Sequence, residues 1–122
     1  EKNITVNSTC EHHLLPIIGI AHVAYISKGK VVGLSKINRI VDYYSRRPQV
    51  QERLTLQIVQ ELKKILDTDD VACVIDAKHL CVNLRGIRDI QSSTVTTEFS
   101  GKFKEKEIKK EFLDYIKLEA NF

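Results

Sequence analysis

The sequence predicts an α+β domain in which an antiparallel four-stranded sheet carries two helices between its strand pairs on one face and a further helix at the C-terminus. Three observations favour this fold class. Four segments have the composition or the alternation of strands, and three others have the helical period. Along the chain they follow the order strands, two helices, strands, helix. The 122 residues suffice for one domain, residues 1–122, with its own core.

The first two expected strands lie near the N-terminus. Residues 2–9 alternate loosely, and residues 17–27 are rich in β-branched and apolar side chains. Residues 71–86 form the third expected strand. In it, His79, Cys81 and Arg85 share one face with the other odd-numbered residues, whereas the even-numbered apolar residues share the opposite face, which we expect to be the core face. The Thr-rich segment 92–103 is its expected partner.

Helical spacing appears between the two strand pairs and again at the C-terminus. Apolar side chains between residues 37 and 44 repeat at this spacing, Ser35 can cap the helix, and Pro48 breaks it. A second stripe runs from 50 to 66, and a third from 108 to 116. A four-stranded sheet has two open edges, which invite pairing with another copy of the chain. We therefore expect a homo-oligomer.

Composition excludes several classes of protein. Apolar residues make up 43% and charged residues 29%, and the net charge of +3 is too small to indicate a nucleic-acid or membrane partner. No apolar run approaches the roughly 20 residues that span a bilayer. Three cysteines without a regular framework argue against a disulfide scaffold. A reducing, cytoplasmic location is the expectation, where cysteine with histidine more often serves a metal or catalysis.

Candidate metal ligands gather in two short motifs. Cys10 and His13 are separated by two residues, a spacing seen in zinc sites, and His12 lies between them. His79 and Cys81 are two apart on one face of the expected strand, so both side chains can point at the same space. Thiolate with imidazole favours zinc over magnesium or calcium.

The number of candidates favours a catalytic over a structural zinc, and both alternatives remain open. A structural zinc takes four protein ligands, whereas a catalytic zinc takes three and leaves one position to water. Histidines left free beside the ion would act as general acids and bases. We expect His22 to be a strand histidine with a local hydrogen bond. We expect Cys73, eight residues from Cys81, to be a small buried apolar residue.

A basic cluster marks the expected start of the first helix. Lys36 and Arg39 share a helix face beside Ser35, and free backbone N–H groups at a helix start favour anions. Arg85 can add charge from the third strand. This pattern suits a phosphate, although a solvated basic helix end is the common alternative. Glu52 either stabilises the helix dipole of the second helix or accepts two N–H donors from a base such as guanine.

The motifs CEHH, GLSKINRIV, RPQVQERLT, HLCV and RGIRD stand in this order, and in them the chain resembles the zinc-dependent GTP cyclohydrolase I family. The resemblance runs from about residue 7 to about residue 117. It implies roles for specific side chains. The zinc ligands would be Cys10, His13 and Cys81, and the acid/base histidines His12 and His79. The guanine pocket would be formed by Glu52 with backbone near Gln51 and Leu34, and the triphosphate contacts by Ser35, Lys36, Arg39 and Arg85.

The resemblance also implies a reaction and an assembly. The imidazole ring of GTP would be hydrolysed at C8 with release of formate, and the ribose would then rearrange to give dihydroneopterin triphosphate. The fold would be the tunnelling fold, closed into a barrel by five subunits and stacked as a decamer of two pentamers, with active sites between subunits. The N-terminal helical segment usual in the family is expected to be absent from this chain.

Other classes fit the motifs less well. Nitrile-reducing relatives use a nucleophilic cysteine and NADPH and do not need CEHH together with H-x-C. A non-catalytic subunit with a structural zinc would hold the metal without turnover. A zinc nucleoside deaminase needs H-x-E and P-C-x-x-C, and the sequence contains neither motif.

Overall fold

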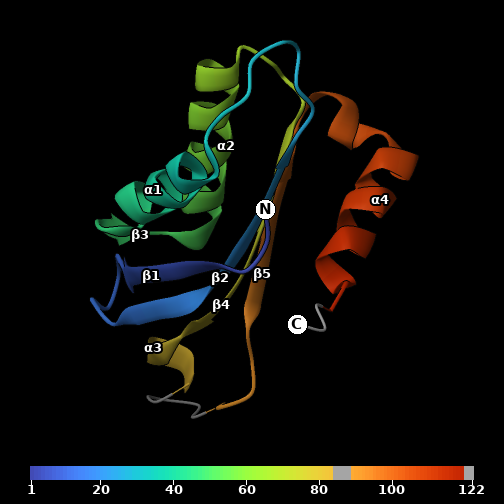
Figure 1. The fold of residues 1–122 in the computed structure, drawn as a ribbon. Coiled ribbons are helices and arrows are strands. Elements are labelled where there is room, and N and C mark those ends of the chain that lie inside the picture. The colour runs from blue at the N-terminus through green and yellow to red at the C-terminus, as the bar shows by residue number, and fades with distance from the viewer. Residues whose placement is uncertain (84–88, 120–122) are drawn as a thin grey trace.

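The computed structural model describes residues 1–83 and 89–119 of the chain (Figure 1). Its elements confirm an α+β fold. In chain order they are β1 (Ile4–Cys10), β2 (Pro16–Tyr25), α1 (Leu34–Ser45), β3 (Pro48–Gln49), α2 (Gln51–Leu66), β4 (Val71–His79), α3 (Leu80–Asn83), β5 (Thr94–Phe99), the 3₁₀ helix η1 (Gly101–Lys104) and α4 (Lys106–Lys117). No helix in the described ranges is both long enough and apolar enough to cross a membrane.

The strands form one mixed sheet in the order β3-β1-β2-β4-β5. The pairs β1–β2, β2–β4 and β4–β5 are antiparallel, as expected. The expectation of a four-stranded antiparallel sheet was wrong in its number of strands and in this one pairing, because β3 adds a fifth strand parallel to β1. This strand pairs only Thr9 with Pro48 and Cys10 with Gln49. Two residues are too few to show an alternation in the sequence.

Helices cover both faces of the sheet (Figure 1). The helices α1 and α2 lie on one face and enclose the main core, to which β4 contributes Val71, Cys73 and Ile75. The helix α4 lies on the other face, over a smaller core that includes the even-numbered residues Ala72 and Val74. Our expectation that the even-numbered face of this strand is the core face was therefore incomplete. Both faces are buried, and the odd-numbered one faces the larger core.

The strand β4 ends at His79, seven residues earlier than predicted. On one side its partner β2 begins at Pro16, whose neighbour Ile17 is the last residue in register with β4, opposite His79. On the other side, pairing with β5 stops at Ala77 opposite Thr94. A chain with no partner on either side has no ladder to extend, so it turns into α3. His79 and Cys81 therefore do not share a strand face.

The first long helix starts two residues earlier than a cap at Ser35 would place it. It begins at Leu34 with Gly33 as its N-cap, and no side chain caps it, so the proposed cap by Ser35 was wrong. The second helix begins at Gln51 and carries Glu52 in its first turn, where a carboxylate stabilises the positive end of the helix dipole.

His22 is a buried strand histidine with a local hydrogen bond, as predicted. The residue is only 4% exposed, and the backbone N–H of Asn3 donates to Nδ1 of its ring at 3.1 Å. Burial lowers the pKa of His22 below the ordinary 6.5, and the positive charge of Lys2 lowers it further, against a smaller opposing effect of Asp76. A proton on Nδ1 would also break the bond from Asn3.

We expect the protein to lose stability on acidification partly through His22. Because the folded pKa lies below that of the unfolded chain, the unfolded state takes up the proton first as pH falls below 6.5. Denaturant titrations should give a free energy of unfolding that falls by at most about 1.4 kcal/mol per pH unit through this proton. His22→Gln, which can still accept from Asn3, should flatten the profile below 6.5. An identical profile for the variant would exclude this contribution.

Candidate metal centre and active site

The CEHH motif lies where β1 turns into β2. The backbone N–H of Cys10 donates to the carbonyl of Leu15 at 2.8 Å, and the N–H of Leu14 donates to the carbonyl of Cys10 at 2.8 Å. Leu14 takes a left-handed conformation, with φ of 55°. This tight turn keeps Cys10 buried at 8% exposure and leaves His12 and His13 exposed, with ring centroids 6.4 Å apart.

The helical turn α3 brings Cys81 to the CEHH turn. One ligand atom from each of Cys10, His13 and Cys81 lies within 4.8 Å of the others, a group that can hold a metal ion. Ligands of a tetrahedral zinc lie roughly 3.8 Å apart, from Zn–S bonds of about 2.3 Å. The donor set of two sulfurs and one imidazole nitrogen suits zinc, and small movements would bring it to that spacing.

The Cys81 thiol is affected by its surroundings. Burial raises the pKa of the Cys81 thiol, and the neighbouring Cys10 raises it further. The Cys81 thiol therefore does not ionise easily on its own, and a divalent cation would supply the charge that favours its thiolate. Cys73 differs from Cys81. Burial in the main core raises its pKa to about 12, so it is an inert buried thiol, as the sequence predicts.

His79 stands beside this cluster, two residues before Cys81. Its Nε2 lies 2.6 Å from Oε1 of Gln51, the first residue of α2. Burial lowers the pKa of the His79 ring, against the opposing charge of Glu52, which is exposed in the same first turn of α2. The turn after β1, the end of β4 and the start of α2 thus converge on one place.

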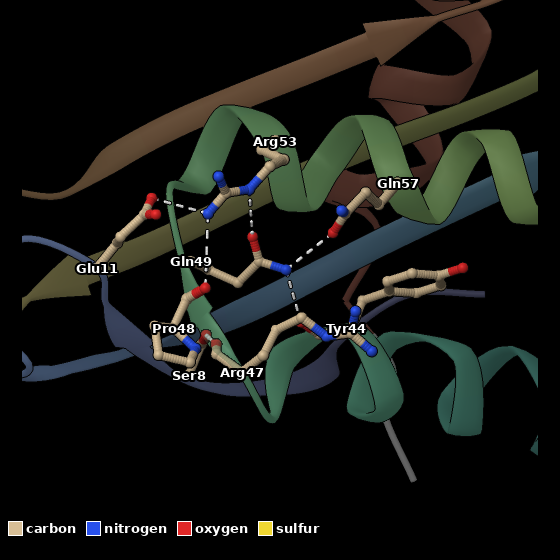
Figure 2. Close-up of polar contacts among 8 residues, drawn as sticks. All are labelled: Ser8, Glu11, Tyr44, Arg47, Pro48, Gln49, Arg53 and Gln57. Atoms are coloured by element: carbon tan, nitrogen blue, oxygen red, sulfur yellow. Dashed lines mark hydrogen bonds and ion pairs between the residues drawn. The ribbon is translucent and has the colours of Figure 1, made fainter.

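An arginine joins the CEHH turn to α2 (Figure 2). Nη2 of Arg53 donates to Oε2 of Glu11 at 2.8 Å and to the carbonyl of Pro48 at 3.5 Å, and its Nε donates to Oε1 of Gln49 at 3.2 Å. The backbone N–H of Glu11 also donates to the Gln49 carbonyl at 2.9 Å. The residue that follows Cys10 is therefore held by both its backbone and its side chain.

Gln49 is the buried centre of this network. Its Nε2 donates to the carbonyl of Tyr44 at 2.7 Å and to Oε1 of Gln57 at 2.8 Å (Figure 2). Because a carbonyl only accepts, the amide nitrogen must face Tyr44 and the amide oxygen must face Arg53. Gln49 and Arg53 were not among the predicted site residues, although both lie in the motif RPQVQERLT. The pair of Arg53 with Glu11 could not be predicted from local spacing, because these residues are 42 positions apart.

The expected anion-binding residues do not join this cluster within one chain. The helix α1 has 12 residues, and its C-terminal end leads into β3 beside Cys10, so its first turn lies roughly 16 Å away along the helix axis. Leu34 is 69% exposed there, and Lys36 and Arg39 line a groove between α1 and α2. Ser35 is exposed at the same end. Arg85 lies outside the described residues.

Comparison with known proteins finds relatives over the part of the chain that carries these candidate metal ligands. Residues 1–117 match the GTP cyclohydrolase I family. The chain belongs to this family. It is 78% identical over its whole length to "GTP cyclohydrolase 1" of Flavobacterium johnsoniae, which it covers to 55%. Over 103 residues, 84% of the chain, it is 59% identical to the protein of the same name from Vibrio campbellii, covering 48% of it. It is also 55% identical over 117 residues to that of Aeromonas salmonicida, covering 54%.

The chain spans about half the length of these GTP cyclohydrolase I relatives. The matched part contains the metal cluster, His79 and the start of α2. Because this family is metal-dependent, metal binding is the expected use of the Cys-His-Cys cluster.

We expect Arg53→Met to loosen the CEHH turn without unfolding the domain. Its pair with Glu11 is half-exposed, so the free energy of unfolding should change by less than about 1 kcal/mol. Hydrogen exchange of the Glu11 amide should quicken by up to about five-fold. Arg46→Met is the matched control, because Arg46 pairs with Asp42 at 2.7 Å on α1. Equal exchange at Glu11 in both variants would show that Arg53 does not hold the turn.

Proposed function

We propose that the protein is a zinc-dependent GTP cyclohydrolase I, which hydrolyses the imidazole ring of GTP at C8, releases formate and rearranges the ribose to yield dihydroneopterin triphosphate. The observation that carries this proposal is the convergence of two thiols and an imidazole beside a second, partly buried imidazole. Family membership supports the choice of reaction. A structural zinc would not by itself require His79 at this place.

Cys10, His13 and Cys81 would hold the zinc ion. Three protein ligands leave a fourth position open, as catalytic zinc sites require. A zinc ion so held supplies Lewis acidity, which makes water a nucleophile at neutral pH. The exposure of His13 and the partial exposure of Cys81 leave the site accessible to a substrate.

His12 and His79 would carry protons during the reaction. His12 adjoins a ligand and is exposed, so it can reach a substrate from the CEHH turn. His79 lies at the end of β4, where its ring is hydrogen-bonded to Gln51 of α2. Ring opening at C8 requires a proton on the departing ring nitrogen, and the ribose rearrangement requires both donors and acceptors, so two imidazoles match the demand.

Glu52 would bind the guanine base. Its exposed carboxylate in the first turn of α2 can accept from N1–H and the exocyclic amino group of guanine together. Backbone groups near Gln51 and Leu34 would complete the pocket. This arrangement would hold C8 of the base toward the metal ligands, so that binding energy from the remote groups of GTP orients the reacting atom.

A second copy of the chain would complete the site. The basic residues at the start of α1 lie far from the metal cluster of their own chain, so we propose that Leu34, Ser35, Lys36 and Arg39 serve the cluster of a neighbour. Leu34 would contribute backbone to the guanine pocket, and Ser35, Lys36 and Arg39 would contact the triphosphate together with Arg85. The edge strand β5, with Val95 58% exposed, offers a surface for pairing. The assembly would be the tunnelling fold as a decamer of two pentamers. Its reduced thiols would suit the cytoplasm.

Formate release from GTP tests the proposed reaction. The zinc-loaded chain should release formate, and Cys81→Ser should lose metal affinity and formate release by at least about 100-fold because one zinc ligand is gone. Cys73→Ala is the matched cysteine control and should retain both within about two-fold, since Cys73 lies in the core.

Two results would contradict the proposal. Absence of formate from a wild-type chain with zinc bound would leave a structural or ligand-binding site. Undiminished formate from Cys81→Ser would remove Cys81 from the metal centre.

Base recognition gives a separate prediction. Glu52→Gln should lower kcat/KM for GTP by about 10- to 100-fold, because a charged acceptor of two hydrogen bonds is lost. The preference for GTP over inosine triphosphate, which lacks the exocyclic amino group, should shrink. Glu107→Gln, in the first turn of α4, is the control for removal of an exposed carboxylate. An unchanged preference between the two nucleotides would exclude Glu52 from the base pocket.

A further inference from the structure

Gln51 is a buried residue at the edge of the candidate active site. It is 2% exposed, although it begins α2 next to the exposed Glu52. Its Nε2 donates to the carbonyl of Ile75 at 3.2 Å, to the carbonyl of Thr94 at 2.9 Å and to Oγ1 of Thr96 at 3.1 Å. Its Oε1 meets Nε2 of His79 at 2.6 Å.

Two carbonyls fix which way this amide points. A backbone carbonyl only accepts, so the nitrogen of the Gln51 side chain must face Ile75 and Thr94. The oxygen is then left for His79. A rotated amide would set its oxygen against both carbonyls and leave buried groups unpaired.

The hydroxyl groups beside the amide agree with this direction. Oγ1 of Thr55 donates its one hydrogen to the carbonyl of Gln51 at 2.9 Å. The contact of 2.7 Å between Thr55 and Thr96 must therefore use the hydrogen of Thr96. With its hydrogen committed, Oγ1 of Thr96 can only accept from the amide of Gln51. Donation therefore runs one way, from His79 to the side chain of Gln51, from that amide to Thr96 of β5, and from Thr96 to Thr55 of α2.

We propose that Gln51 is a positioning residue that fixes the tautomer of His79. Because Oε1 of Gln51 can only accept, Nε2 of His79 must carry the hydrogen in their bond of 2.6 Å. The neutral ring then presents Nδ1 without a hydrogen, and no described residue hydrogen-bonds that atom. Nδ1 is thus the nitrogen that exchanges protons with the substrate. This inference rests on the proposed function, in which His79 transfers protons.

The same bonds exclude the Gln51 side chain from the guanine pocket. Its amide hydrogens are shared among three acceptors, and its oxygen is occupied by His79. A guanine base would therefore meet only the backbone groups of Gln51, and not its side chain. The three partners of the amide nitrogen belong to β4 and β5. The position of the His79 ring therefore depends on the sheet, and not on the exposed turn that carries His12.

The tautomer can be observed directly in the wild-type protein. Long-range proton–nitrogen NMR of the zinc-loaded full chain, labelled with 15N-histidine and studied at about pH 8, where imidazole is neutral, distinguishes Nδ1 from Nε2 protonation. His79→Ala assigns the signal by its loss. We expect His79 to be protonated on Nε2 alone. A hydrogen on Nδ1 would overturn the proposal, and this readout does not depend on turnover.

Kinetics of Gln51→Met then test the role of the bond. Methionine fills a similar volume but cannot accept from His79, so the tautomer should become mixed and kcat should fall by on the order of 10- to 100-fold. Zinc content and KM for GTP should stay within about two-fold. Gln60→Met replaces an exposed glutamine of the same helix and is the matched control.

A double variant separates positioning from binding. In the His79→Ala background, Gln51→Met should cause little further loss of kcat, because the residue through which Gln51 acts is gone. Additive losses, or a rise in KM with an unchanged His79 tautomer, would show instead that Gln51 contacts the substrate. If the wild-type chain released no formate, the proposed function would fail, while the NMR result would still decide the tautomer.

Discussion

The pairing of Cys10 with Gln49 joins the two halves of the candidate site. The bridge is only two residues long, yet it places the end of β1 beside the residue that precedes α2 by two positions. The position of the start of α2 relative to the Cys-His-Cys cluster depends on this register. A slip by one residue would turn Gln49 away from the protein interior, where it binds Tyr44 and Gln57, and would separate Glu11 from Arg53.

The site combines a rigid side with an adaptable one. His79 is fixed by a buried amide that is itself bonded to two carbonyls and a hydroxyl, so the ring has little freedom. The CEHH turn is exposed, and its ion pair with Arg53 is half-exposed and individually weak. Binding of a metal by Cys10, His13 and Cys81 would therefore order the turn more than it would order β4.

The sequence predicted the long elements and the residues of the Cys-His-Cys cluster well, because both lie in motifs that can be read locally. The apolar stripe of α2 matches the helix Gln51–Leu66. The spacing in CEHH and H-x-C indicated five candidate ligands, and the family resemblance singled out the three that lie together. Features that depend on distant partners were missed. The end of β4 at His79 depends on where β2 and β5 run out, and the bond between Gln51 and His79 joins residues 28 positions apart.

The separation between the basic end of α1 and the metal cluster has a genetic consequence. If each site takes its metal ligands from one chain and its phosphate-binding residues from another, then no single chain contains a complete site. Two alleles, one damaged at Cys81 and the other at Arg39, could then restore function in a cell that expresses both, because some mixed assemblies would pair an intact cluster with an intact helix end. By the same logic, one defective allele would impair sites built partly from healthy chains.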